Sequence, residues 1–376
     1  MDLLDLRKQI DEIDEELIPL LLKRMSISQK VAQYKVERGL PVLNEQREKE
    51  ILDDVHKKCG DQGDTIATVF AATMDASRAI QHKIIGGGRE LRKLIEQAVS
   101  DENAFEKEAS VACAGVDGSY ADKTASVLFP NSQIKHYRLF EDVFEAVNKG
   151  EAPFGIIPVE NSTAGSVHEA YDLIMKYRFY VVGSYSLEVK HCLCAKQDTK
   201  YEDIDEVYSH PQALSQCSKF IKDFDFTGVN YTNTAAAAKF VSESERNDIG
   251  VICSAEAAKK YNLKIIKAGI QNISSNFTRF IVISKKLVIE KGADKISLIF
   301  SLPHQTGSLY RVLGRFSMTG LNLTKLESRP MENGDFSYYF YTDLLGSVKN
   351  EKTLDLLCAL SSELPDFKFL GNYHEY

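Results

Sequence analysis

The chain has 376 residues, of which 44% are hydrophobic and 27% are charged, and its formal net charge is −8 at pH 7. This length exceeds what a single hydrophobic core supports, so about two to three globular domains are expected. The acidic balance argues against nucleic acid as a partner, and the lack of a long apolar run or a signal-peptide pattern predicts a cytoplasmic protein that binds no membrane.

The first forty residues have the apolar spacing of one long amphipathic helix. At about 100° per residue, Arg24 and Lys35 fall on its apolar stripe. An unpaired buried cation is costly, so this face should meet an anion, either a carboxylate of a neighbouring helix or a small bound dianion. Arg7 lies about 25 Å earlier along the helix axis, so it can reach the same small ligand only from a second copy of the chain. The sequence therefore predicts a homodimer or a higher homo-oligomer with shared sites.

Two more helices follow in the same block. Asn44 caps the second, and the third runs from Asp64 to about Ile84. Ser77 and Gln81 lie on the core-facing stripe of the third helix. Three glycines then end the block. The expected domains are a helical domain at 1–88, a connecting helix within 89–109, an α/β domain at 110–285 and an α+β module at 286–376.

The helical block carries a series of motifs: Leu6-Arg7, Ile10-Asp11-x-Ile13-Asp14, Lys23-Arg24, Lys35, Pro41-Val42, Arg47-Glu48 and Ser77-x-x-x-Gln81. Through them it resembles the all-helical family of chorismate mutases. The resemblance implies substrate contacts at Arg7, Arg24, Lys35, Asn44, Arg47, Glu48, Ser77 and Gln81. Chorismate is a dicarboxylate, and its rearrangement needs cations that hold the carboxylates and stabilise charge on the ether oxygen. We assign Lys35 and Gln81 to that oxygen and Glu48 to a substrate hydroxyl.

From Ser110 onward, short apolar strands alternate with helices, which predicts an α/β domain with largely parallel sheets. Small hydroxyl and amide side chains beside glycine or proline mark four segments: Gly115–Tyr120, Pro158–Gly165, Ser209–Cys217 and Asn276–Phe280. Each alone is a turn signal, but together and in this order they resemble prephenate dehydratases. The family fold has two α/β lobes around a cleft, as in periplasmic binding proteins. Its reaction removes carbon dioxide and water from prephenate.

This second resemblance implies that Thr278 is essential and that Asn161 and Gln216 take part in catalysis. It also implies substrate contacts at Ser119, Glu160, Asn161, Ser162, Arg279 and Phe280. A threonine hydroxyl is a weak acid, so we expect Thr278 to position or relay a proton. The final donor stays open between Glu160 and His210.

From Lys295 the pattern restarts as a small βαββαβ module. The expected elements are a strand to 302, a helix at 306–319, strands at 323–327 and 336–341, a helix at 352–364 and a strand at 367–370. The motifs Leu302-Pro-His304-x-x-Gly307-Ser308-Leu309 and Asn322–Pro330 resemble phenylalanine-sensing ACT domains, which are ferredoxin-like. The resemblance implies phenylalanine contacts at Gly307, Ser308, Leu309, Glu327, Ser328, Arg329 and Pro330. Such modules usually pair across a dimer, so phenylalanine would bind between the subunits and favour a less active arrangement. Feedback inhibition by phenylalanine is therefore expected.

The sequence thus predicts a bifunctional chorismate mutase and prephenate dehydratase of phenylalanine biosynthesis with a phenylalanine sensor. No cofactor is expected, and the seven scattered cysteines form no metal-binding motif. Two alternatives stay open. One is an arogenate dehydratase, which a comparison of the two substrates would distinguish. The other is a non-catalytic amino-acid sensor, against which Thr278 and the cations of the helical block argue.

Overall fold

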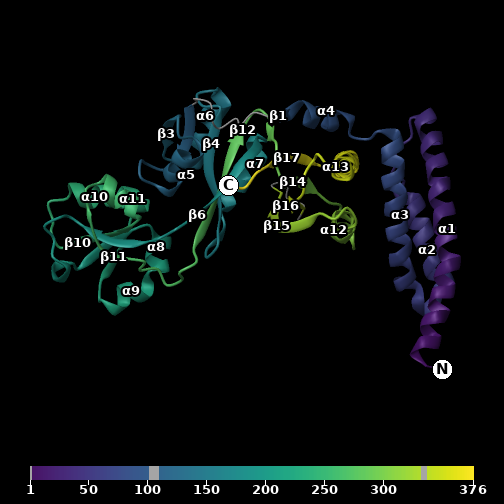
Figure 1. Cartoon of the computed structure of the whole chain (residues 1–376), viewed down its shortest axis with the longest axis horizontal. Helices are drawn as coiled ribbons and strands as arrows, with labels where there is room; N and C mark the ends of the chain where they lie inside the picture. The colour runs from purple at the N-terminus through teal and green to yellow at the C-terminus, as the bar shows by residue number, and fades with distance from the viewer. Residues whose placement is uncertain (1, 101–109, 332–336) are drawn as a thin grey trace. The chain divides into compact units, whose positions relative to one another are not determined.

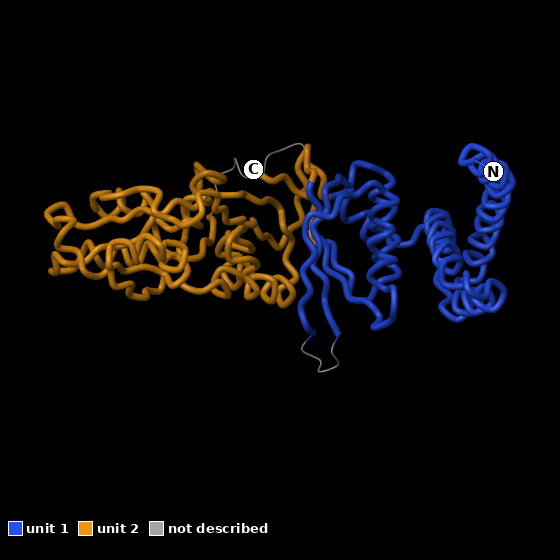
Figure 2. Tube along the Cα trace, turned by 90° about the horizontal axis from the view of Figure 1, so that it is seen from below, with its two compact units in different colours: residues 1–97, 295–369 blue, residues 98–294, 370–376 orange. Residues whose placement is uncertain are grey.

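The computed structural model describes residues 2–100, 110–331 and 337–376, which fall into two compact units. Unit 1 comprises residues 1–97 and 295–369, and unit 2 comprises residues 98–294 and 370–376 (Figure 2). Among the described residues, no helix combines the length and the apolar content needed to cross a membrane.

Three helices form the N-terminal part of unit 1, as predicted: α1 Leu3–Arg38, α2 Glu45–Cys59 and α3 Gly63–Ile85 (Figure 1). A short 3-10 turn, η1 Gly60–Gln62, precedes α3. Asn44 caps α2 as predicted, because its side chain accepts a hydrogen bond from the Arg47 N–H at 3.0 Å.

The connecting helix is shorter than predicted. Helix α4 spans Arg89–Ala98, and strand β1 Val99–Ser100 follows directly. Strand β1 pairs in parallel with β13 Ile289–Glu290, and this pairing holds the backbone extended. The predicted helix is therefore wrong at residues 99–100, and its remainder lies outside the described residues.

The apolar face of α1 is largely exposed in the single chain. Within this helix the buried residues are Ser28 and Ala32. In contrast, Ile10, Ile13 and Leu17 are 57%, 63% and 45% exposed. An apolar stripe of this length is normally covered, so α1 retains the surface that the predicted homodimer requires.

From Lys295 onward the chain has the predicted βαββαβ order: β14 Lys295–Ser301, α12 Ser308–Met318, β15 Asn322–Pro330, β16 Tyr338–Leu345, α13 Glu351–Glu363 and β17 Lys368–Tyr373. The four strands form one sheet in the order β15-β16-β14-β17. Residue 336, where we expected the third strand to begin, lies outside the described residues.

A buried ionic cluster connects α3 with α12 and α13. The Glu363 carboxylate lies 2.5 Å from His82 Nε2 and 2.7 Å from Arg315 Nη1, and Arg78 Nε is 3.7 Å away. Burial opposes ionisation of Glu363, but the contact with His82 and the charges of Arg315, His82 and Arg78 outweigh it. They lower the pKa of Glu363 to about 2.

This cluster should make the stability of unit 1 sensitive to acid. The folded pKa of Glu363 lies below its ordinary value of 4.5. Its ionised form therefore contributes stability that is fully present above that value and is lost as the pH falls toward 2. We expect Glu363→Gln to destabilise the unit at pH 7 by roughly 3–5 kcal/mol, because breaking a buried pair leaves charges uncompensated. Thermal unfolding at pH 7 and pH 4 measures both effects.

The control for this prediction is Glu351→Gln, which removes a 77% exposed carboxylate from the first turn of the same helix. It should change the unfolding temperature little. Between pH 7 and pH 4, the Glu363→Gln variant should lose less stability than the wild type. An equal loss in both proteins would contradict this role of Glu363.

Unit 2 contains two mixed sheets, each covered by helices (Figure 1). The first has the order β3-β2-β4-β12-β6, with β5 beside β4. Its elements are β2 Ser110–Ala114, α5 Tyr120–Leu128, β3 Gln133–Tyr137, α6 Phe140–Lys149, β4 Phe154–Asn161, β5 Gly165–Ser166, α7 His168–Tyr177, β6 Tyr180–Glu188 and β12 Phe277–Ser284.

The second sheet has the order β11-β7-β10-β8-β9. Its elements are β7 Cys192–Ala195, η2 Tyr201–Asp203, β8 Glu206–Ser209, α8 Pro211–Gln216, α9 Ser218–Asp223, β9 Thr227–Asn230, α10 Thr234–Glu243, β10 Ile249–Cys253, α11 Ala255–Lys260 and β11 Lys264–Ala268. The chain crosses into this sheet after β6 and returns to the first sheet at β12.

The prediction of largely parallel sheets is wrong. Within these two sheets, parallel pairing of the strands is found for β2 with β3 and β4, and for β8 with β9 and β10. The strands next to the two crossings, β7 and β12, run antiparallel to their neighbours. After each crossing, the chain enters the sheet in the direction opposite to that of the neighbouring strands. Local sequence patterns contain no information about where the chain crosses.

Residues 370–376 belong to unit 2 and lie along the edge strand β6. The Ser184 N–H donates to the His374 carbonyl at 3.1 Å, and the Tyr376 N–H donates to the Ser184 carbonyl at 2.9 Å. Glu375 forms a parallel bridge with Ser184. This segment thus covers part of an otherwise open sheet edge.

Candidate active sites

The helical block brings Arg24 and Ser77 together, as the sequence predicted. Arg24 Nη1 donates to Ser77 Oγ at 2.6 Å and to the Thr73 carbonyl at 3.2 Å. These contacts join α1 to α3. A guanidinium held on one side by neutral acceptors keeps its charge available for an anion.

Lys35 and Glu48 lie near each other, because the Glu48 carboxylate acts on the Lys35 ammonium. Lys35 Nζ donates to the Val42 carbonyl at 2.5 Å. Burial lowers the pKa of Lys35, the Glu48 carboxylate raises it, and the Arg78 guanidinium lowers it again, with a net shift downward. Glu48 in turn pairs with Arg78, which also pairs with Asp75. Sequence reasoning missed Arg78, although it directly follows Ser77.

The remaining predicted residues of this block differ in their placement. Gln81 is buried, and its Oε1 has no hydrogen-bond partner among the described residues. Arg47 pairs with Glu50 at 3.3 Å on the exposed face of α2. Arg7 lies on the exposed N-terminal part of α1 and joins none of these groups. One chain therefore joins Arg24 to Ser77 and places Lys35 near Glu48, whereas Arg7 and Arg47 lie on exposed surfaces.

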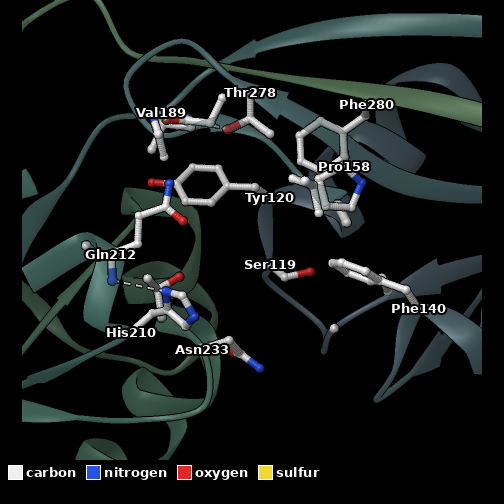
Figure 3. A pocket seen from close by; sticks show the side chains of 18 of the residues that line it. Ser119, Tyr120, Phe140, Pro158, Val189, His210, Gln212, Asn233, Thr278 and Phe280 are labelled. Carbon is white, nitrogen blue, oxygen red and sulfur yellow. Dashed lines mark hydrogen bonds between the residues drawn. The ribbon is translucent and has the colours of Figure 1, made fainter. Parts of the chain in front are cut away.

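Unit 2 contains a cavity of about 570 Å³, a size suited to a small metabolite. Five predicted site residues line it: Ser119, Asn161, Gln216, Thr278 and Phe280. In Figure 3, Thr278 and Phe280 lie on one side, and His210, Gln212 and Asn233 face them from the other. The cavity thus draws its walls from both sheets of the unit.

Several helices begin at this cavity, among them α5 and α10. Ser119 caps α5 and Asn233 caps α10, and both residues line the cavity. Helix N-termini carry partial positive charge and favour anions. The lining also includes Arg138, which sequence reasoning did not single out. The arrangement suits an anionic ligand.

Thr278 and Asn161 sit opposite each other on β12 and β4. Asn161 Nδ2 donates to Thr278 Oγ1 at 2.9 Å. The next pair in the register, Arg279 and Glu160, projects from the other face and forms an ion pair at 3.1 Å. Ser162 Oγ instead accepts the Phe277 N–H at 2.9 Å. Glu160, Ser162 and Arg279 are therefore absent from the cavity lining.

Two histidines line the cavity. His210 caps α8, and its Nδ1 accepts the Gln212 N–H at 3.2 Å, so this nitrogen carries no proton. Burial lowers the pKa of His210, which favours the neutral ring. Sequence reasoning gave His191 no role. It lies 2.9 Å from Gln216 Oε1 and is 2% exposed.

The predicted effector residues lie at the start of α12 and along β15. Gly307 has φ +79°, a conformation that favours glycine, and Ser308 behind it is buried. Glu327 and Arg329 alternate with more exposed neighbours on β15, an edge strand of its sheet. The N-terminus of α12 is a suitable place for a carboxylate.

Comparison with known proteins finds two matching families and relatives of full length. The family described as chorismate mutase type II matches residues 6–82, and the family described as prephenate dehydratase matches residues 111–288. A bifunctional chorismate mutase/prephenate dehydratase from Aquifex aeolicus is 31% identical over 375 residues, which cover 99% of this chain and 98% of that protein.

Two shorter relatives match the later part of the chain. Arogenate dehydratase 2 from Petunia hybrida is 34% identical over 280 residues, or 70% of this chain and 71% of that protein. The structure of a prephenate dehydratase from Arthrobacter aurescens in complex with L-Phe has a TM-score of 0.65 and 25% identity, covering 70% of this chain and 90% of that one.

Proposed function

The chain belongs to the family of bifunctional chorismate mutase/prephenate dehydratases, and from this premise we propose how its residues carry out and regulate the two reactions. It is an enzyme of phenylalanine biosynthesis that rearranges chorismate to prephenate and converts prephenate to phenylpyruvate. We assign the first reaction to residues 1–88, the second to 110–285 and regulation to 286–376.

For the mutase reaction, Arg24 and Lys35 hold the substrate carboxylates and the ether oxygen, with help from Gln81. The support is the contact of Arg24 on α1 with Ser77 on α3, the Lys35 ammonium near Glu48, and the buried Gln81 side chain, whose oxygen has no partner among the described residues. A homodimer supplies Arg7 from the second chain across the exposed stripe of α1. Positive groups that are fixed before the reaction stabilise charge as it develops on the ether oxygen.

For the dehydratase reaction, the main supporting observation is that Thr278 is hydrogen-bonded to Asn161 in a cavity that also receives the N-termini of α5 and α10. The bond from the ring to the carboxylate breaks, and carbon dioxide is released. The electrons of that bond aromatise the ring, so the hydroxyl group is expelled from the opposite carbon. Thr278 donates a hydrogen bond to that leaving hydroxyl, which departs as water after taking up a proton. Aromatisation drives the step, so seating the dianion is the main task of the site.

The C-terminal module is an ACT domain that binds phenylalanine at Gly307–Leu309 and Glu327–Pro330 and reports it to the dehydratase. Support comes from its βαββαβ order, from the left-handed Gly307 before α12, and from the L-Phe bound in the Arthrobacter aurescens relative. An effector can lower activity only to the extent that it binds the less active state more tightly than the active state.

Chorismate supplied to the purified protein tests these assignments together. Chorismate should disappear and phenylpyruvate should form, and saturating phenylalanine should slow phenylpyruvate formation by about 5-fold or more. Rates on prephenate and arogenate, measured side by side, identify the preferred dehydratase substrate. Tyrosine, which adds one hydroxyl, is the control for the effector. If phenylalanine alters neither the rates nor the quaternary structure, the regulatory assignment fails.

A further inference from the structure

Two residues beside the unit 2 cavity, the exposed Thr163 and the buried Asn276, connect the Asn161 and Gln216 amides that line it. Neither residue is among the lining residues, and Asn276 is 1% exposed. Thr163 Oγ1 donates to Asn161 Oδ1 and accepts from Gln216 Nε2, both at 2.7 Å. Asn276 Oδ1 accepts from Asn161 Nδ2 at 2.8 Å, and Asn276 Nδ2 donates to Gln216 Oε1 at 3.1 Å. Asn161 and Gln216 are thus bridged twice.

The backbone sets the orientation of the Asn161 amide. The N–H groups of Thr163 and Ala164 lie 3.1 and 3.0 Å from Asn161 Oδ1. A backbone N–H can only donate, so the atom that faces both groups is the oxygen. The nitrogen Nδ2 therefore faces Thr278 Oγ1 and donates to it.

The orientation of the Asn161 amide determines the orientation of the Asn276 and Gln216 amides. Because Asn161 presents its nitrogen, Asn276 must present Oδ1 to it and Nδ2 to Gln216. Gln216 Oε1 is then the acceptor for His191 Nε2, so the proton of His191 is on Nε2. Burial lowers the pKa of His191 despite its bond to Gln216, which agrees with a neutral ring.

The network determines what the Thr278 hydroxyl can do. Its oxygen accepts a hydrogen from Asn161, so its own hydrogen cannot point there and is left for a ligand in the cavity. We propose that Thr163 and Asn276 are positioning residues of the dehydratase, which hold Asn161 and Gln216 in a single orientation so that Thr278 acts only as a donor. Reversing one amide would place an acceptor where the network needs a donor.

This inference rests on the proposed role of Thr278, and the experiment separates the two. Asn276→Asp keeps the shape of the side chain and replaces the donor toward Gln216 by a carboxylate oxygen. At pH 7.5 we expect kcat of the dehydratase to fall by about 10-fold or more while KM stays within about twofold. Protonation of the new carboxyl restores one donor, so kcat should recover relative to the wild type as the pH is lowered.

A second substitution tests the other bridge. Thr163→Val removes the hydroxyl at nearly constant volume and should lower kcat, whereas Thr163→Ser should restore most of it. The control for Thr163→Val is Thr124→Val, which removes a buried hydroxyl of the same unit that donates to the Tyr120 carbonyl. The control for Asn276→Asp is Asn272→Asp, the same change at an exposed asparagine whose Nδ2 donates to Ser215 and Ser218.

The outcomes are distinct. The titratable and charged residues that line the cavity, Tyr120, Arg138, Glu169, His191 and His210, and the nearby Arg279–Glu160 pair are present in the wild type and in every variant, so their contribution cancels in the comparison. A pH profile of Asn276→Asp parallel to that of the wild type, or full kcat in Thr163→Val, would overturn the positioning role. The proposed function would still stand if Thr278→Ala were inactive. Full activity in Thr278→Ala would instead remove the role of Thr278 itself.

Discussion

Replacing Lys35 by alanine should slow chorismate rearrangement by roughly 10²–10³-fold, because the variant loses a preorganised cation at the ether oxygen. The ammonium group reaches the Val42 carbonyl and is near Glu48, so it is already fixed in place before substrate binds. Burial is the main cause that lowers the pKa of Lys35, so its ammonium loses its proton at a lower pH than an exposed lysine does. As the pH is raised, wild-type mutase activity should therefore decline before the pH at which an exposed lysine is deprotonated. Steady-state rates measured against pH test both statements.

Prephenate dehydration by the same protein is the internal control, since its residues lie in unit 2. Mixed subunits give a sharper check on the shared site. In a hybrid of an Arg7→Ala chain and a Lys35→Ala chain, one site receives both substitutions and the other receives neither. Random mixing should therefore restore about a quarter of wild-type mutase activity from two inactive parents. Retention of near-normal activity in Lys35→Ala, or no recovery on mixing, would refute this arrangement.

Thr278→Ala should lower the turnover of prephenate by roughly 10²–10⁴-fold, the range expected when a group that assists proton transfer is lost. The hydroxyl lies in the cavity wall opposite His210 and Gln212 and is held by Asn161 at 2.9 Å (Figure 3). Thr278→Ser keeps the hydroxyl and should retain much of the rate. Phenylpyruvate formation from prephenate is the measurement.

Chorismate consumption should be unchanged in Thr278→Ala, and a normal thermal unfolding transition would show that unit 2 has folded. If the alanine variant turned prephenate over at the wild-type rate, the hydroxyl would have no part in the reaction. If the serine variant were as slow as alanine, the methyl group rather than the hydroxyl would be the essential feature.

Local sequence patterns were sufficient for much of the fold. The three N-terminal helices and the βαββαβ module follow from apolar periodicity and from caps such as Asn44. The errors arose where partners distant in sequence decide the structure. Strand β1 exists because it pairs with β13, and β7 and β12 run antiparallel because the chain crosses twice between the sheets. No short window of residues contains that information.

The same contrast holds for the sites. Thr278, Asn161 and Gln216 belong to recognisable segments, and the structure gathers all three at one cavity. Asn276 could not be assigned a role from sequence, because its importance lies in contacts with residues 60 and 115 positions away. Glu160 and Arg279 belong to the same segments, but strand alternation turns them away from the cavity toward each other.

The segment 370–376 has a consequence for how the protein is made. It covers part of the edge of β6 in unit 2, yet the ribosome produces it after residues 295–369. During synthesis, the sheet that carries Thr278 therefore waits with an uncovered strand until the module that follows it has emerged. A nascent or prematurely stopped chain that ends before residue 370 would present that strand to other chains, so we expect such a chain to aggregate more readily than the full one.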